Sequence, residues 1–89
     1  EIPDNCFENC TRLAKIILPE GITSIGANAF SGCVELFSIY FPTTLKKIGE
    51  NAFTNCSNGL YDNAYYGGEN WNSVEGRGNF NPYKNKKPY

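Results

Sequence analysis

The sequence predicts a repeat solenoid of mixed α+β character, in which about two and a half coils combine short parallel strands with single helical turns. The main observation is a set of residues that returns after 23 positions: Gly26, Asn28, Ala29, Phe30 and Cys33 recur as Gly49, Asn51, Ala52, Phe53 and Cys56. The same register extends upstream to Ile2, Asn5, Phe7 and Cys10. Self-similarity at a fixed period between 20 and 50 residues is typical of stacked repeats, because one coil of this length cannot close its own core.

Each coil is expected to begin with a helical turn. Phe30 and Cys33 stand at positions i and i+3, which is one face of such a turn, and Asn28 precedes them. Asn is a good N-cap, because its side chain accepts a hydrogen bond from an otherwise unpaired backbone N–H. We therefore interpret the recurring Asn as a capping residue rather than as a ligand.

A short strand follows at residues 13–18 and again at 36–41, and Pro19 and Pro42 end it by removing a backbone donor. Alternation with period two points Ile16 and Leu18 inward in one coil, and Ile39 and Phe41 inward in the next. A second extended piece is expected at residues 22–25 and 45–48. A glycine turn then leads into the next coil.

The outward positions of the longer strand form a candidate binding face. They are Lys15 and Ile17 in one coil and Phe37, Ser38 and Tyr40 in the next. Phe37 and Tyr40 stand where a solvated sheet face usually carries Lys or Thr. Ordinary exposed apolar surface and a protein-binding face both explain this pattern.

The repeat pattern breaks after Cys56, so we divide the chain into repeats at 1–57 and an irregular C-terminal cap or tail at 58–89. Leu60 to Tyr66 fits an extended segment if one residue is inserted. The tail is rich in aromatic residues, Gly and Asn. It is interpreted as a cap over the last coil, as a sugar-binding segment built on Tyr65, Tyr66 and Trp71, or as a flexible tail.

Cys10, Cys33 and Cys56 share one column of the repeat, and Cys6 shares the column of Ala29 and Ala52. A cysteine repeated once per coil is typical of a small buried hydrophobic residue. Adjacent coils would lie about 5 Å apart, so a disulfide between neighbouring coils is also geometrically feasible. The sequence leaves the oxidation state of the four cysteines open.

Composition excludes several classes of function. The net charge is −1, from 8 basic and 9 acidic residues without a concentrated basic face, which argues against nucleic acid and anionic membranes as partners. No apolar run approaches the ~20 residues of a membrane-spanning helix. The chain has no His, so a Ser-His-Asp or Cys-His catalytic pair is impossible. We expect no catalytic residues, no metal site and no cofactor.

The unit Ile-x4-Phe-x2-Cys-x2-Leu-x2-Ile-x-Leu-Pro, read from Ile2 to Pro19 and again from Ile25 to Pro42 with Phe at the second Leu position, resembles the BspA-type leucine-rich repeat. The resemblance implies a secreted or cell-surface bacterial protein that binds host or matrix proteins through its sheet, without catalytic residues. A glycan partner and a purely structural spacer remain alternatives.

Few coils are present. At roughly 4.8 Å per coil the array is about 12–15 Å thick, which is small beside the ~800 Å² per partner of a standard interface. Either the tail contributes to binding or the chain, which starts at Glu1 without Met, is a piece of a longer array. No polar cap precedes Ile2, so we expect this end to pack against a neighbouring domain or to self-associate.

Overall fold

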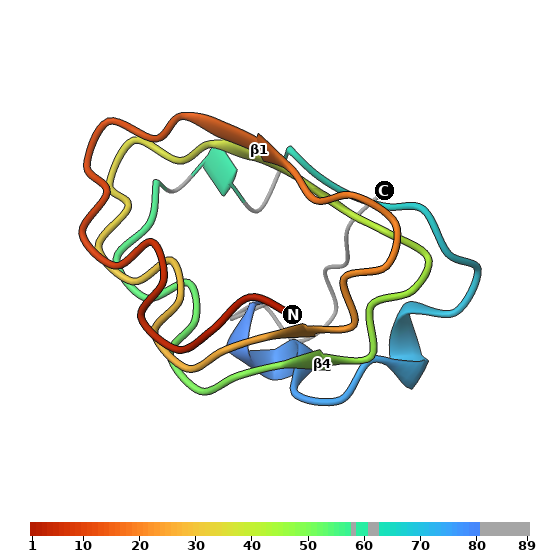
Figure 1. The fold of residues 1–89 in the computed structure, drawn as a ribbon. Helices are drawn as coiled ribbons and strands as arrows, with labels where there is room; N and C mark the ends of the chain where they lie inside the picture. The colour runs from red at the N-terminus through yellow and green to blue at the C-terminus, as the bar shows by residue number, and fades with distance from the viewer. Residues whose placement is uncertain (58, 61–62, 81–89) are drawn as a thin grey trace.

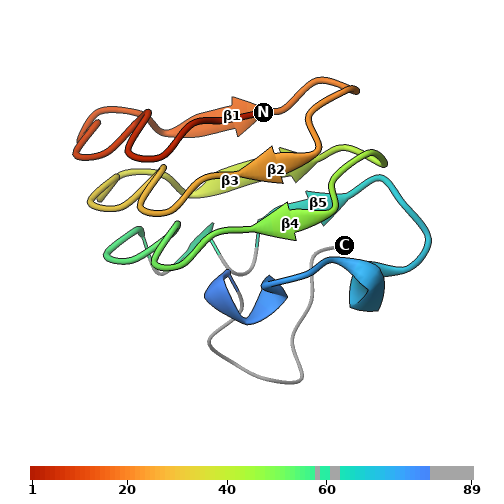
Figure 2. The ribbon, with the colours of Figure 1, turned by 60° about the horizontal axis from the view of Figure 1, so that its bottom comes forward.

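The computed structural model describes residues 1–57, 59–60 and 63–80. Successive coils superimpose into one ring when viewed along the stack (Figure 1) and lie as separate layers when viewed from the side (Figure 2). Two parallel sheets lie on opposite sides of the ring. The first contains β1 (Lys15–Ile17), β3 (Ser38–Phe41) and β5 (Ala64–Tyr66), and the second contains β2 (Ser24–Ile25) and β4 (Lys47–Ile48). The repeat solenoid that the sequence predicts is confirmed.

Strand pairing follows the repeat period. Lys15 lies opposite Ser38 and Ser24 lies opposite Lys47, so both pairs join residues 23 positions apart. The pairing of β3 with β5 differs, because Ile39 lies opposite Ala64, an offset of 25. Two extra residues therefore precede β5, whereas the sequence predicts one.

Hydrogen-bonded turns connect the second sheet of one coil to the first sheet of the next. In the second coil the N–H groups of Ala29, Ser31 and Cys33 donate to carbonyl oxygens three residues earlier, which is the 3-10 pattern. The alternate N–H groups donate to carbonyl oxygens of the following coil, and they belong to Asn28, Phe30 and Gly32. Each turn thus satisfies its own backbone and also binds its neighbour.

The recurring asparagines do not cap these turns. Asn5, Asn28 and Asn51 have φ values of 61°, 57° and 58°, which lie in the left-handed region, whereas an N-cap residue has an extended backbone. The capping interpretation is therefore wrong. Asn recurs because it adopts the left-handed conformation at lower cost than most other L-residues.

Apolar columns fill the ring. The rings of Phe7, Phe30 and Phe53 stack in sequence, with centroids 5.2 Å apart at each step and interplanar angles of 11° and 7°. Leu18 and Ile39 point inward as predicted, with 3% and 1% of their surface exposed. Consecutive coils are therefore joined by aromatic packing inside and by backbone hydrogen bonds at the turns.

Beyond β5 the described chain contains two 3-10 helices, η2 (Trp71–Ser73) and η3 (Arg77–Asn79), yet it keeps a trace of the repeat. Glu75 forms a bridge with Lys47 of β4, and the N–H of Ile48 donates to the Glu75 carbonyl over 2.8 Å. The Gly76-x3-Phe80 segment repeats the Gly-x3-Phe spacing found after each strand of the second sheet, displaced by 27 residues instead of 23. Residues 71–80 thus form a modified coil.

This modified coil covers the open end of the last regular coil (Figure 2). Phe80 packs edge-on against Phe53 and Phe41, with ring centroids 5.1 and 5.0 Å away. Trp71 and Val74 are also buried, at 6% and 0% exposure. The edge-on rings end the stacked column, because they present no parallel face to a further coil.

Phe80→Ala should lower the free energy of unfolding by about 3–5 kcal/mol, because it empties a buried aromatic site that three other rings surround. Tyr65→Ala is the matched control. Its side chain is 45% exposed, so we expect a loss below about 1 kcal/mol. Urea denaturation of both variants gives the two values, and equal losses would show that residues 71–80 do not pack on the last coil.

Candidate functional site

The outer surface of the β1–β3–β5 sheet is the candidate site, and we call it the strand face. Its members are Lys15, Ile17, Phe37, Ser38, Tyr40 and Tyr65. Four large hydrophobic side chains are exposed in the described part of the chain, and three of them belong to the strand face: Ile17 at 64%, Phe37 at 47% and Tyr65 at 45%. The fourth, Val34 at 53%, lies in the turn before β3.

Strand register brings these residues together. Ile17 pairs with Tyr40, and Tyr40 pairs with Tyr65, so one apolar and aromatic column crosses all three strands. Lys15 lies opposite Ser38 on the same side of the sheet. Phe37 stands just before β3, where its N–H donates to the Ala14 carbonyl over 2.9 Å.

Tyr40 is held in place by a glycine. The hydroxyl end of its ring lies over Gly67, where a Cβ atom would come within 2.0 Å of the Tyr40 oxygen. Gly67 in turn donates its N–H to the Phe41 carbonyl at 2.9 Å. Tyr40 is consequently half-buried, and its ring forms a fixed part of the surface between Ile17 and Tyr65.

The alternative sugar-binding set does not form one platform. Tyr65 belongs to the strand face, whereas Tyr66 and Trp71 pack against each other with ring centroids 5.3 Å apart. Trp71 is only 6% exposed, and its ring also packs against that of Phe41, with centroids 5.4 Å apart. A ring that stacks on a sugar must offer an open face, and the buried Trp71 offers none in this arrangement, so a shared Tyr65, Tyr66 and Trp71 site stays a prediction without support from the packing.

The sequence predicts Tyr65 as part of the tail and not of the strand face. The two-residue insertion before β5 moves it out of the 23-residue register, so the period alone does not align it with Tyr40. Ala64, Tyr65 and Tyr66 repeat the alternation of Ile39, Tyr40 and Phe41, in which the middle residue is the more exposed. That short pattern is the signal that identifies Tyr65.

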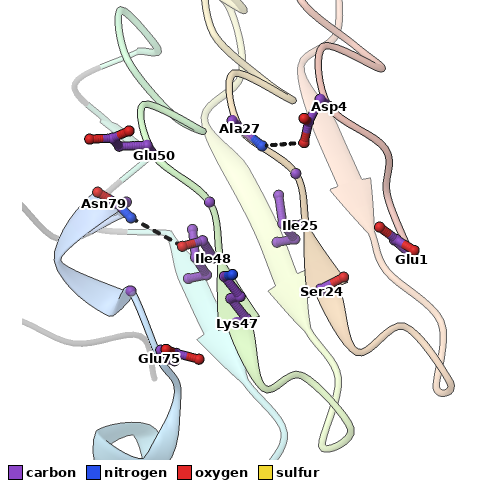
Figure 3. A pocket seen from close by; sticks show the side chains of 13 residues that line it. Glu1, Asp4, Ser24, Ile25, Ala27, Lys47, Ile48, Glu50, Glu75 and Asn79 are labelled. Atoms are coloured by element: carbon purple, nitrogen blue, oxygen red, sulfur yellow. Dashed lines mark hydrogen bonds between the residues drawn. The ribbon is translucent and has the colours of Figure 1, made fainter.

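A groove of about 480 Å³ crosses the outer side of β2, β4 and residue 75 (Figure 3). Its lining includes the glycine column Gly26, Gly49 and Gly76, and its charged lining residues are Glu1, Asp4, Lys47, Glu50 and Glu75. The glycines are required by coil stacking. A Cβ at Gly49 would lie 2.6 Å from the backbone of the preceding coil.

Two groups that line the groove already have structural partners. Asp4 accepts a hydrogen bond from the Ala27 N–H at 2.9 Å, and the Asn79 amide donates to the Ile48 carbonyl at 3.0 Å (Figure 3). No group of three His, Cys, Asp or Glu side chains could hold a metal ion in the described ranges.

All four cysteines are free thiols. The Sγ of Cys33 donates to the Phe7 carbonyl at 3.1 Å and that of Cys56 to the Phe30 carbonyl at 3.2 Å, so the thiol column also links consecutive coils. Burial raises the pKa of Cys33, and it raises the pKa of Cys56 from 9.0 to about 12. Cys6 is exposed although Ala29 in the same column is buried.

None of the described helices is long and apolar enough to cross a membrane. A comparison with protein families matched residues 1–62 to the family described as BspA type Leucine rich repeat region (6 copies). The match spans 62 of the 89 residues. Neither the curated proteins nor the solved structures gave a significant match.

The buried thiol of Cys56 should make the protein less stable in alkali. The unfolded chain loses this proton near pH 9.0 while the folded chain keeps it to about pH 12. The free energy of unfolding should therefore be independent of this thiol below pH 9 and fall between about pH 9 and 12.

Urea denaturation across that range should show a shallower fall for Cys56→Ala than for the unaltered chain. An exposed-site control, Cys6→Ala, should keep the original slope, and parallel curves for all three proteins would contradict the assignment.

Proposed function

Because this chain belongs to the BspA-type leucine-rich repeat family, we propose that it is a non-catalytic module that binds another protein through its strand face. Leucine-rich repeats generally mediate protein binding, and proteins with the BspA-type repeat are typical of bacterial surfaces. We further propose an extracellular or cell-surface location and a host or matrix protein as the partner. Among the residues described, the concentration of exposed hydrophobic side chains on one sheet supports this proposal best.

The chemistry of the strand face suits a protein partner. Tyr and Phe are enriched at the centres of protein interfaces, where they bury large areas with little loss of side-chain entropy. The column Ile17–Tyr40–Tyr65 supplies such groups on three adjacent strands, and pairing within the sheet fixes their spacing. Lys15 and Ser38 add polar groups beside the column, as expected for the rim of an interface.

The strand face is also a surface that the described part of the fold leaves open. Residues 71–80 cover the end of the last coil and Trp71 is buried there, so the described tail offers no comparable aromatic surface. The strand face itself is only three strands wide, or about 10 Å between its outer strands. We therefore expect a single copy to bind weakly and to gain avidity when several copies are displayed together.

Replacing Ile17, Phe37 and Tyr65 together by Ser should abolish binding in a screen of immobilised host and matrix proteins, with a loss of at least tenfold in affinity for any protein that the unaltered chain binds. These side chains are exposed, so the variant should still fold. Val34→Ser is the matched control, because it removes an exposed apolar group outside the strand face.

The screen also tests the alternatives. Binding that survives the triple replacement, or that Val34→Ser removes equally, would overturn the strand face as the site. A glycan-array signal that the triple variant retains would favour a carbohydrate-binding role at another surface. If the unaltered chain binds nothing on either array when it is displayed at high density, the spacer interpretation replaces the proposal.

A second candidate contact is the outer side of the first coil. Phe7 is half-buried with one ring face stacked on Phe30, and β1 stands at the edge of its sheet. Leu13, Ile16 and Ile22 are also only partly buried and pack against the core. This combination of an open strand edge and incompletely covered apolar groups supports self-association through this end of the solenoid.

Sedimentation equilibrium from about 10 to 500 µM should show reversible self-association of the unaltered chain. Ile16→Lys should abolish it, because a charge would then stand among the partly buried apolar side chains at this end of the solenoid. The triple strand-face variant should associate as the unaltered chain does. A single monomeric species at the highest concentration would exclude this second contact, and loss of association only in the triple variant would move it to the strand face.

A further inference from the structure

Two asparagines on exposed turns stand in the pattern that accepts N-linked oligosaccharide. Asn9-Cys10-Thr11 and Asn55-Cys56-Ser57 both read Asn, a residue other than Pro, and then a hydroxyl residue. They lie 46 residues apart, which is two repeat periods, so they occupy the same column of the solenoid. We infer that Asn9 and Asn55 are acceptor sites for N-linked glycan.

The two sites have the same local structure. Asn9 and Asn55 have φ values of 61° and 62°, and both residues are exposed. The middle coil carries Gly32 in this column, also with a positive φ, of 80°. A side chain there would meet the Asn9 side chain, which lies over Gly32.

The side-chain amides of Asn9 and Asn55 have no hydrogen bond to any described residue, and this distinguishes them from other asparagines. The Asn63 amide donates to the Gly59 carbonyl at 2.9 Å, and the Asn79 amide donates to the Ile48 carbonyl at 3.0 Å. Glycosylation of either of those would break a contact within the fold. Modification of Asn9 or Asn55 breaks no side-chain hydrogen bond to a described residue.

The hydroxyl residues are also available. Thr11 is exposed, and its N–H donates to the Asn9 carbonyl at 2.8 Å, which keeps the hydroxyl residue close to the acceptor. The Ser57 hydroxyl oxygen accepts from the Gly59 N–H at 3.2 Å, and its own proton remains available as a donor. Each hydroxyl can therefore bind the acceptor asparagine or the transferring enzyme.

The donor for this reaction is an oligosaccharide linked to a polyprenyl pyrophosphate, supplied with its transferase by the cell. The amide nitrogen of Asn attacks C1 of the first sugar and forms a C–N bond. The bond from C1 to the pyrophosphate oxygen breaks, the polyprenyl pyrophosphate leaves, and the amide proton passes to a base of the transferase. No oxidation or reduction occurs.

The position of the sites keeps the modification compatible with binding elsewhere. Both asparagines belong to the turns that lie along one edge of the coils, whereas the strand face belongs to the sheet of β1, β3 and β5 (Figure 2). Glycans at this edge would extend from the first and third coils and leave the sheet accessible. The inference does not depend on the proposed partner of the strand face.

The test is secretion of the full chain behind a cleavable leader from a eukaryotic cell, followed by intact mass spectrometry with and without peptide N-glycosidase. We expect two N-linked glycans, and conversion of Asn9 and Asn55 to Asp on enzymatic release. Asn9→Gln and Asn55→Gln should each remove one glycan, and the double variant should remove both.

Thr11→Ala leaves Asn9 in place and should still abolish its glycan, so this variant separates the recognition pattern from an effect of Gln on the turn. Asn5→Gln is the matched control, because Asn5 is exposed with the same φ of 61° but is followed two residues later by Phe7. It should retain both glycans. A secreted, folded chain with unmodified Asn9 and Asn55 overturns the assignment, and so does glycan at Asn9 in the Thr11→Ala variant.

Discussion

The backbone hydrogen bonds between consecutive turns are the interaction on which the rest of the structure depends. A single coil has too few residues to enclose a core, so each coil uses its neighbour to satisfy its N–H groups and to cover its apolar side chains. Asn28, Phe30 and Gly32 donate to the next coil at 3.0, 2.8 and 2.8 Å, and the phenylalanine rings inside are then brought to their 5.2 Å spacing. Glycine in the column of Gly26 and Gly49 permits this approach, because a Cβ there would collide with the preceding backbone.

Each coil needs a neighbour to cover its apolar side chains, and this need also determines the structure at the ends of the array. After the last regular coil the chain makes one more partial turn, in which Glu75 continues the second sheet and Phe80 continues the aromatic column with its ring turned edge-on. A strand face is left between the ends, and its exposed groups are displayed at spacings that strand pairing fixes. The fold thus separates groups that hold the coils together from groups that are available to a partner.

Much of the fold could be predicted from the sequence, because every coil needs the same kinds of residue at the same positions in order to stack. The repeated Phe, Cys and Gly positions indicate the period, and alternation at residues 15–18 and 38–41 assigns the inward and outward side chains correctly. The period fails where extra residues enter, before β5 and again before Glu75, and so Tyr65 and Phe80 lose their alignment with Tyr40 and Phe53. The burial of Trp71 could not be read from composition either. An aromatic residue among Asn and Gly suits a solvent-exposed ligand site as well as it suits a cap, and only the packing against Phe41 decides between them.

The direction of the turn-to-turn hydrogen bonds has an electrostatic consequence. In a parallel sheet neighbouring peptide dipoles largely cancel, because alternate N–H groups point to opposite sides of the strand. Along the turn edge they do not cancel: the N–H groups of Asn5, Phe7 and Asn9 point to the second coil, and those of Asn28, Phe30 and Gly32 point to the third. The peptide dipoles of this edge therefore add along the stacking axis, as they do in an α-helix, with the negative pole at the first coil and the positive pole at the last. A solenoid without a single α-helix in its described residues thus still carries a dipole directed along its stacking axis.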